Sequence, residues 1–223
     1  MKTICILLLL TPISLTLYAQ SDEVVKAKTF NTQPRAEDMS GRGHLLQEEG
    51  DLSSAKEYYW KAIEIDSTNI DYFLSLGDIC LQSQDYELAS KGYDIAKRHF
   101  PDNSDIFYYS GDIFQKMGQY EKAISDYTNA IRICEQTESS FLLYLYYFNR
   151  GNTFLRMKQY QLAIEDYNST LKIFPHHYGA LSNRGMAKFS IRNREGACRD
   201  WEKAYEFGYE EVKKYMIKYC EGK

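Results

Sequence analysis

The sequence predicts an all-α protein built from repeated helical hairpins. Three positions of the repeat carry this prediction, and each is found five times along the chain. We call each set of five equivalent residues a column. The glycines of the first column lie 34, 34, 40 and 34 residues apart: Gly43, Gly77, Gly111, Gly151 and Gly185. An alanine follows twelve residues after each glycine: Ala55, Ala89, Ala123, Ala163 and Ala197. An aromatic residue lies four residues further on: Tyr59, Tyr93, Tyr127, Tyr167 and Trp201. Such a period is typical of a solenoid, because a single hairpin cannot bury its apolar face alone.

Each column has a packing reason. Glycine and alanine allow two helix backbones to approach closely, and the aromatic side chain fills the space between them. A second small column follows three residues after the aromatic: Ala62, Ala96, Ala130, Thr170 and Ala204. Apolar residues also recur at spacings of three and four, which indicates two amphipathic helices in each unit. The five predicted units are residues 36–69, 70–103, 104–137, 144–177 and 178–211.

The amino terminus is typical of a signal peptide spanning residues 1–19. Lys2 supplies a positive charge, residues 4–17 form an apolar core, and Ala19 precedes polar sequence. The core is too short and too interrupted for a good membrane span. We therefore expect an exported protein, periplasmic or secreted, with no membrane span in the mature chain; an uncleaved anchor is the alternative. Residues 20–35 are polar and lack a period, which predicts a flexible lead-in.

Two segments depart from the regular repeat. Residues 138–143 are an insertion that accounts for the interval of 40, so we expect a longer second helix in unit three, a longer first helix in unit four, or both. Residues 209–220 are predicted to form a capping helix. Its apolar stripe would hide the open end of the solenoid, as repeat arrays require: Val212, Tyr215, Met216 and Tyr219.

Four cysteines remain once the signal peptide is removed. In an oxidising compartment, two cysteines that come close are expected to pair. Cys198 opens the second helix of unit five and Cys220 ends the capping helix, and adjacent antiparallel helices bring such positions together. A disulfide there would close a loop of about twenty residues and stabilise the fold by roughly 3 kcal/mol. Two small buried thiols are the alternative. Cys80 and Cys134 lie in different units and are expected in the core.

Composition and motifs argue against several functions. The net charge of −4 is unlike the strongly basic face of a nucleic-acid-binding protein. No cysteine or histidine pair has the spacing of a metal site, and nothing marks a nucleophile with its base. We therefore predict no catalytic residues, no metal and no cofactor, although fold alone never excludes activity.

Across residues 36–211 these columns resemble those of tetratricopeptide repeat (TPR) proteins. The resemblance implies a right-handed α-solenoid of five helix pairs plus the capping helix, in which the first helices line a concave groove. Groove positions of unit two hold Asp71, Leu74, Ser75 and Asp78, so the amino end of the groove is expected to be acidic. The residues expected to bind a partner follow in the later units: Tyr108, Tyr109, Asp112, Phe148, Asn149, Asn152, Arg156, Asn183 and Met186.

The expected function is a non-catalytic protein–protein interaction module that holds a peptide or a partner helix in this groove. Tyr108 and Phe148 would anchor the partner. Asn149 and Asn183 precede an Arg-Gly pair in consecutive units, and their amides can donate and accept hydrogen bonds along an extended peptide. The alternative for these two asparagines is that they cap or bridge neighbouring helices.

The run at residues 141–148, FLLYLYYF, is entirely apolar. A helix exposes all its faces over eight residues, so this run is either extra core between units three and four or a patch for a partner. The patch interpretation leads to the alternative function: a structural or assembly factor of an envelope complex, acting through self-association or through this patch. A homo-oligomer would fit that role.

Overall fold

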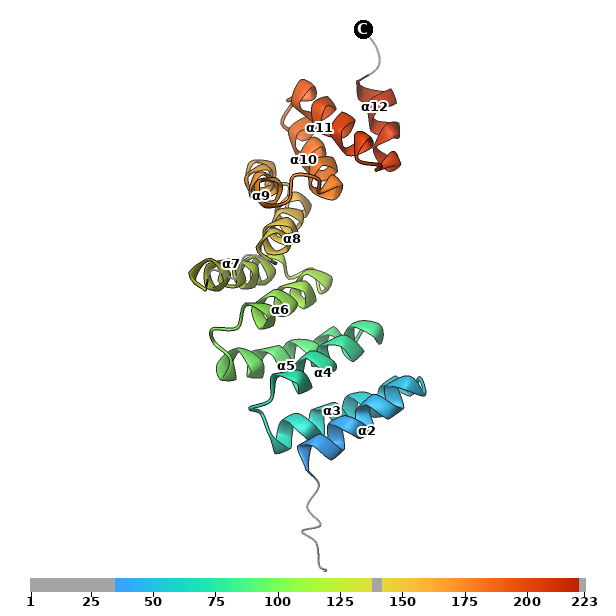
Figure 1. The fold of residues 1–223 in the computed structure, drawn as a ribbon, viewed down its shortest axis with the longest axis vertical. Coiled ribbons are helices and arrows are strands. Elements are labelled where there is room, and N and C mark those ends of the chain that lie inside the picture. Colours follow the sequence, from blue (N-terminus) through green and yellow to red (C-terminus); the bar gives the residue numbers. More distant parts are fainter. Residues whose placement is uncertain (1–34, 138–141, 221–223) are drawn as a thin grey trace, which may run out of the picture. The chain divides into compact units, whose positions relative to one another are not determined.

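The computed structural model describes residues 35–137 and 142–220 (Figure 1). The chain divides into two units, with the boundary between Arg35 and Ala36. All helices described here lie in the second unit. The predicted signal peptide, most of the predicted lead-in, and residues 138–141 of the insertion lie outside the described residues.

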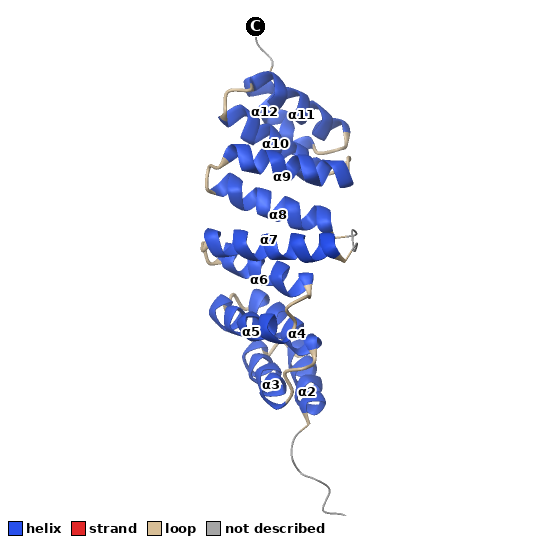
Figure 2. Ribbon diagram, turned by 90° about the vertical axis from the view of Figure 1, so that its left-hand side faces the viewer, coloured by secondary structure: helices blue, strands red, loops and turns tan. Residues whose placement is uncertain are grey.

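Within the described residues the structure is helical throughout and contains no strand. Ten helices form five consecutive pairs: α2 (Ala36–Glu48) with α3 (Leu52–Ile65), α4 (Ile70–Gln82) with α5 (Tyr86–His99), α6 (Ser104–Lys116) with α7 (Tyr120–Gln136), α8 (Leu143–Arg156) with α9 (Tyr160–Ile173), and α10 (Tyr178–Ser190) with α11 (Arg194–Glu206). The second helix of each pair packs on the first helix of the next, which gives the stack in Figure 2. The predicted all-α solenoid is confirmed.

The turn between the two helices of each pair contains one residue with left-handed backbone geometry. Its φ lies between +57° and +83° in all five turns: Gly50, Gln84, Gly118, Lys158 and Arg192. In three of the turns the next residue caps the second helix with its side chain, as when Asp51 accepts a hydrogen bond from the backbone N–H of Ser54 at 3.1 Å. Asp and Asn are favoured at this position because their oxygens satisfy an otherwise unpaired backbone donor. Local polar residues thus set short, equal connections.

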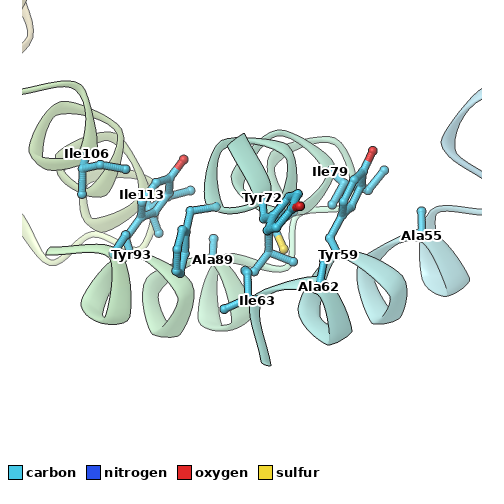
Figure 3. Close-up of a cluster of buried hydrophobic side chains, with 14 of the residues drawn as sticks. Ala55, Tyr59, Ala62, Ile63, Tyr72, Ile79, Ala89, Tyr93, Ile106 and Ile113 are labelled. Atoms are coloured by element: carbon cyan, nitrogen blue, oxygen red, sulfur yellow. The ribbon is translucent and has the colours of Figure 1, made fainter. Parts of the chain in front are cut away.

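The repeated columns meet in the core. Every ring of the aromatic column is at most 2% exposed, and the glycine of the same unit lies beside it. A Cβ atom placed on Gly111, for example, would lie 2.8 Å from two ring carbons of Tyr127. Figure 3 shows this core in the first two pairs and α6, with Tyr59 and Tyr93 among the buried alanines and isoleucines. The close approach of each pair therefore depends on the absence of a side chain at the column glycine.

Buried carboxylates form a second, polar repeat, which the sequence analysis missed. They lie fifteen residues after the column glycine in the last three pairs: Asp126, Asp166 and Asp200. Arg150 donates to both oxygens of Asp166 at 2.8 and 2.7 Å. Arg184 donates to both oxygens of Asp200 at 2.9 and 2.6 Å. These bidentate pairs join the first and second helices of the fourth and fifth pairs.

The insertion mainly lengthens α7, which has 17 residues against 14 in α3 and α5; α8 has 14 against 13 in α4 and α6. None of residues 142–148 is exposed. Tyr146 is 1% exposed and donates to Asp105 Oδ1 at 2.6 Å, and Leu142, Leu143 and Tyr147 pack around it. Four residues of the run therefore belong to a core cluster between the third and fourth pairs: Leu142, Leu143, Tyr146 and Tyr147. Phe141 lies outside the described residues.

The capping segment is divided into two short elements, a 3₁₀ turn η1 (Glu210–Val212) and helix α12 (Lys213–Tyr219). Val212 is fully buried, and the other members of the predicted stripe pack against α11. A disulfide joins Cys198 to Cys220, with 5.8 Å between the Cα atoms. Cys80 and Cys134 are buried in separate core clusters.

Candidate functional site

The first helices of the pairs share one side of the stack, which we call the first-helix face. Its residues stand at fixed steps from each column glycine, so the repeat itself aligns them. Three steps before the glycine are Leu74, Tyr108 and Phe148; two steps before are Ser75, Tyr109, Asn149 and Asn183; one step after are Asp78, Asp112, Asn152 and Met186. The predicted groove residues all lie on these helices, with Arg156 exposed at the end of α8.

Two adjoining hollows lie on the amino-terminal part of this face. The larger, of about 600 Å³, is lined by residues of α2 and α4: His44, Gln47, Glu48, Leu74, Ser75, Asp78 and Gln82. The smaller, of about 250 Å³, continues towards α6 and is lined by Leu74, Asp78, Leu81, Tyr93 and Tyr109. They share Leu74 and Asp78. No lysine or arginine lines either hollow in the part of the chain that the structure describes.

Asp78 lies where the two hollows meet, and one oxygen of its carboxylate accepts two hydrogen bonds. The side-chain amides of Gln47 and Gln82 donate to Oδ2 at 3.1 and 2.7 Å. Both bonds use the same oxygen, so Oδ1 remains for a donor from outside. Burial, together with the charge of Asp78, raises the pKa of Tyr59 to about 12. With Glu48 on the adjoining wall, this hollow favours a cation.

Tyrosines form the far wall of the smaller hollow. Tyr109 is 38% exposed and stacks nearly parallel to Tyr93, with ring centroids 6.5 Å apart. The ring of Tyr108 lies 5.2 Å from that of Tyr109. Behind them, Asp112 accepts a hydrogen bond from Tyr127 at 2.5 Å, and burial raises the pKa of its carboxyl. Tyr109 is thus an accessible aromatic surface on a rigid support.

Each of the two predicted asparagines bonds to the first helix of the preceding pair. Asn149 Nδ2 donates to the Tyr108 hydroxyl at 3.0 Å, which links α8 to α6. Asn183 Nδ2 donates to Asn152 Oδ1 at 2.8 Å, which links α10 to α8, and the same oxygen accepts from Tyr167 at 2.9 Å. These contacts match the bridging alternative, in which the amides hold successive first helices in register.

Of the nine predicted partner-binding residues, Tyr109 lines one of these two hollows, and the other eight line neither. Met186 packs in the last core cluster, and Phe148 packs against His177 with ring centroids 4.5 Å apart. The α2 wall was missed: His44 and Gln47 lie one and four residues after Gly43. Both residues could have been predicted from the sequence by applying the groove positions of the later units to the first unit.

His177 joins this face to the turn before α10. Its Nδ1 accepts a hydrogen bond from the backbone N–H of Ala180 at 3.0 Å, so the cap requires an unprotonated nitrogen. The imidazole also lies among the rings of Tyr144, Phe148 and Phe174. Burial lowers the pKa of His177 below its ordinary value of 6.5.

The lowered pKa predicts a pH-dependent stability. Below about pH 6.5 the unfolded chain takes up a proton at His177 before the folded chain does. The stabilising contribution of the neutral ring is therefore complete above that pH and is lost as the pH falls towards the folded pKa. His177→Asn keeps a side-chain cap without titrating, so its free energy of unfolding in urea should fall less between pH 7.5 and 5.5 than that of the wild type.

His176→Asn is the matched control, because His176 is exposed at the neighbouring position. It should retain the wild-type pH dependence. An identical loss of stability in His177→Asn and in the wild type over this pH range would contradict the assignment.

Two negative findings complete the site. Among residues 35–137 and 142–220, no group of three His, Cys, Asp or Glu side chains is placed to hold a metal ion. No helix in the same residues is long and apolar enough to cross a membrane.

Known proteins support the repeat and the fold. Tetratricopeptide repeat models match residues 41–69 and 102–176. Among solved structures, a crystal structure of MamA aligns with TM-score 0.69 and 21% identity, covering 80% of this chain and 94% of that chain. YrrB, described as a TPR protein with an unusual peptide-binding site, aligns with TM-score 0.63 and 22% identity, covering 86% and 92%. PilF of Pseudomonas aeruginosa aligns with TM-score 0.63 and 19% identity, covering 78% and 76%.

None of the curated proteins matches the chain. At these identities the solved structures inform the fold alone. The repeat models, the buried columns and the paired helices agree with one another. The chain therefore carries tetratricopeptide repeats and folds as a solenoid of helix pairs.

Proposed function

We propose that this chain is a non-catalytic protein–protein interaction module whose first-helix face holds an extended segment of a partner. The observation that carries the proposal is the pair of adjoining hollows, which share Leu74 and Asp78 and together span α2, α4 and α6. An extended segment can place successive side chains in neighbouring hollows along such a row of helices.

The lining defines the chemistry of the partner segment. Asp78 and Glu48 favour a lysine or arginine, which would donate to Asp78 Oδ1. Leu74, Leu81 and Tyr109 favour an apolar or aromatic side chain in the smaller hollow. We therefore propose a partner segment with a basic residue close to an apolar one. A longer segment would continue past Tyr109 towards Phe148, Asn149 and Asn183.

The place of action proposed is outside the cytoplasm. Residues 1–19 have the features of a signal peptide, and a disulfide in a small domain suits an oxidising compartment. The alternative role as an assembly factor through residues 141–148 gains little from the fold, because Tyr146 is buried and the other residues of 142–148 are half-buried, with none exposed.

The test uses a random library of ten-residue peptides selected on residues 20–223, followed by fluorescence anisotropy of the selected peptides. Selected peptides should be rich in Lys or Arg next to an apolar residue. Asp78→Asn removes the charge but keeps the shape, and it should weaken their binding about tenfold, the effect of losing one charge-assisted hydrogen bond. The weakening should shrink at high salt.

Asp71→Asn is the matched control, because Asp71 is an exposed carboxylate of the same helix that lines neither hollow. It should bind like the wild type. In a double Asn149→Ala and Asn183→Ala variant, weaker binding with an unchanged free energy of unfolding would indicate that the segment reaches the later pairs, because both amides also bridge helices. Selection of acidic peptides, or wild-type affinity in Asp78→Asn, would overturn the proposed site.

A further inference from the structure

The last two elements of the chain cover the end of the stack, and we call residues 209–220 the cap. The ring of Tyr215 stacks on that of Trp201 with centroids 5.4 Å apart. The ring centroids of Tyr219 and Phe189 lie 4.4 Å apart. Val212 and Trp201 are both fully buried. The cap thus shields an apolar surface formed by α10 and α11.

Besides this packing, one covalent bond and a hydrogen bond from Arg194 Nε of α11 to Tyr219 O hold the cap. Helix α12 has seven residues, about half of what an isolated helix needs to be stable. The disulfide between Cys198 and Cys220 ties its far end to α11. Its near end joins α11 through residues 207–209, where Gly208 has a φ of +87° and the Tyr209 N–H bonds back to Ala204 O at 3.0 Å. This connection is a short hinge.

In the structure, the surface under the cap is covered by the cap itself. The opposite end of the stack would fit it poorly, because α2 exposes mainly charged side chains beside Leu45: Glu37, Asp38, Arg42 and Glu48. Burying those charges against Trp201 would be unfavourable. A second copy of the chain can therefore cover the surface best by supplying its own cap.

We propose that the disulfide keeps each cap on its own chain, and that reduction lets two copies exchange caps to form a dimer. In the exchanged dimer each cap makes its present contacts on the other copy, so the only regions that must change are the two hinges at residues 207–209. The interaction surface is thus the end of α10 and α11, and the partner is a second copy.

The chemistry balances as thiol–disulfide exchange. One thiolate of a reducing dithiol attacks a sulfur of the disulfide, and the second thiolate releases the protein from the mixed disulfide. The reagent is oxidised by two electrons and the protein gains two thiols. A low-molecular-weight disulfide then accepts two electrons from Cys198 of one copy and Cys220 of the other, which joins them. Both cysteines are only half-buried, so reagents can reach them.

The decisive experiment mixes two variants of the mature chain, Cys198→Ser and Cys220→Ser. Neither can form the internal disulfide, but the mixture can form the bond between copies if caps exchange. After incubation with oxidised glutathione, the mixture should give several-fold more linked dimer on a non-reducing gel than either variant alone. Peptide mass spectrometry should place the bond between Cys198 and Cys220.

The wild-type chain supplies a second arm that does not depend on the folding of the variants. Wild type that is reduced and then reoxidised at high concentration should contain linked dimer, and never-reduced wild type should stay monomeric by light scattering. Monomers alone in the mixture and in the reoxidised wild type would overturn the proposal. Equal dimer in a single variant would also overturn it, because it would show collision of exposed thiols without cap exchange.

Discussion

Replacing Asp200 by alanine should destabilise the protein by about 3 kcal/mol, because it leaves two half-buried cations without their buried counterion. Arg184 holds both oxygens of this carboxylate, and Lys188 Nζ lies 2.8 Å from Oδ2. The side chain of Asp200 is 4% exposed. Arg184 and Lys188 retain some access to water, which keeps the loss at the lower end of the range for broken buried pairs. Urea unfolding followed by circular dichroism measures it.

Glu195→Ala is the control for this variant. Its pair with Arg199 lies on the same helix but is well exposed, so its removal should change the free energy of unfolding by less than about 1 kcal/mol. Losses of equal size in the two variants would show that burial does not decide the strength of these pairs.

Gly185→Ala should destabilise the protein by about 2 kcal/mol through overpacking. The added Cβ would lie 2.4 Å from Nε1 and 2.7 Å from Cδ1 of Trp201. That ring cannot retreat, because it is fully buried and its Nε1 donates to Ser182 O at 3.2 Å. The same urea titration checks the result, and near-ultraviolet circular dichroism should report the displaced indole.

Gly41→Ala provides the opposite case. Gly41 also lies inside a first helix, but a Cβ there would meet nothing within 4 Å. The variant should be more stable than the wild type by up to about 1 kcal/mol, the difference in helix propensity between alanine and glycine. A stabilising effect of Gly185→Ala would contradict the proposed reason for the glycine column.

The sequence predicted the helix pairs because their packing repeats. Gly111, Ala123 and Tyr127 are each constrained by neighbours that lie at fixed steps along the same unit, so the constraint appears as a column. The buried carboxylate of Asp166 also lies at a fixed step, fifteen residues after Gly151. It was missed because the same position holds Tyr58 and Gly92 in the first two units, so that the aspartates of the last three units do not form a column through the whole chain.

The site was predicted less completely. The first-helix positions and the acidic amino end were expected, and Leu74, Ser75 and Asp78 do line the hollows. Asn149 and Asn183 were predicted either to face a partner or to bridge neighbouring helices, and their amides bond to Tyr108 and Asn152. A column position identifies the helix face on which an amide lies. The neighbour that takes up its hydrogen bonds depends on the side chain across the pair boundary.

By itself, the sequence determined the number of pairs, their order and the close contacts within each, because a glycine, an alanine and an aromatic ring at fixed spacing admit one way of packing. Only the tertiary structure decided where the first-helix face is hollow and where it is filled. That outcome depends on which side chains from successive pairs meet: Gln47 and Gln82 leave room around Asp78, whereas Asn183 and Tyr167 close the space around Asn152.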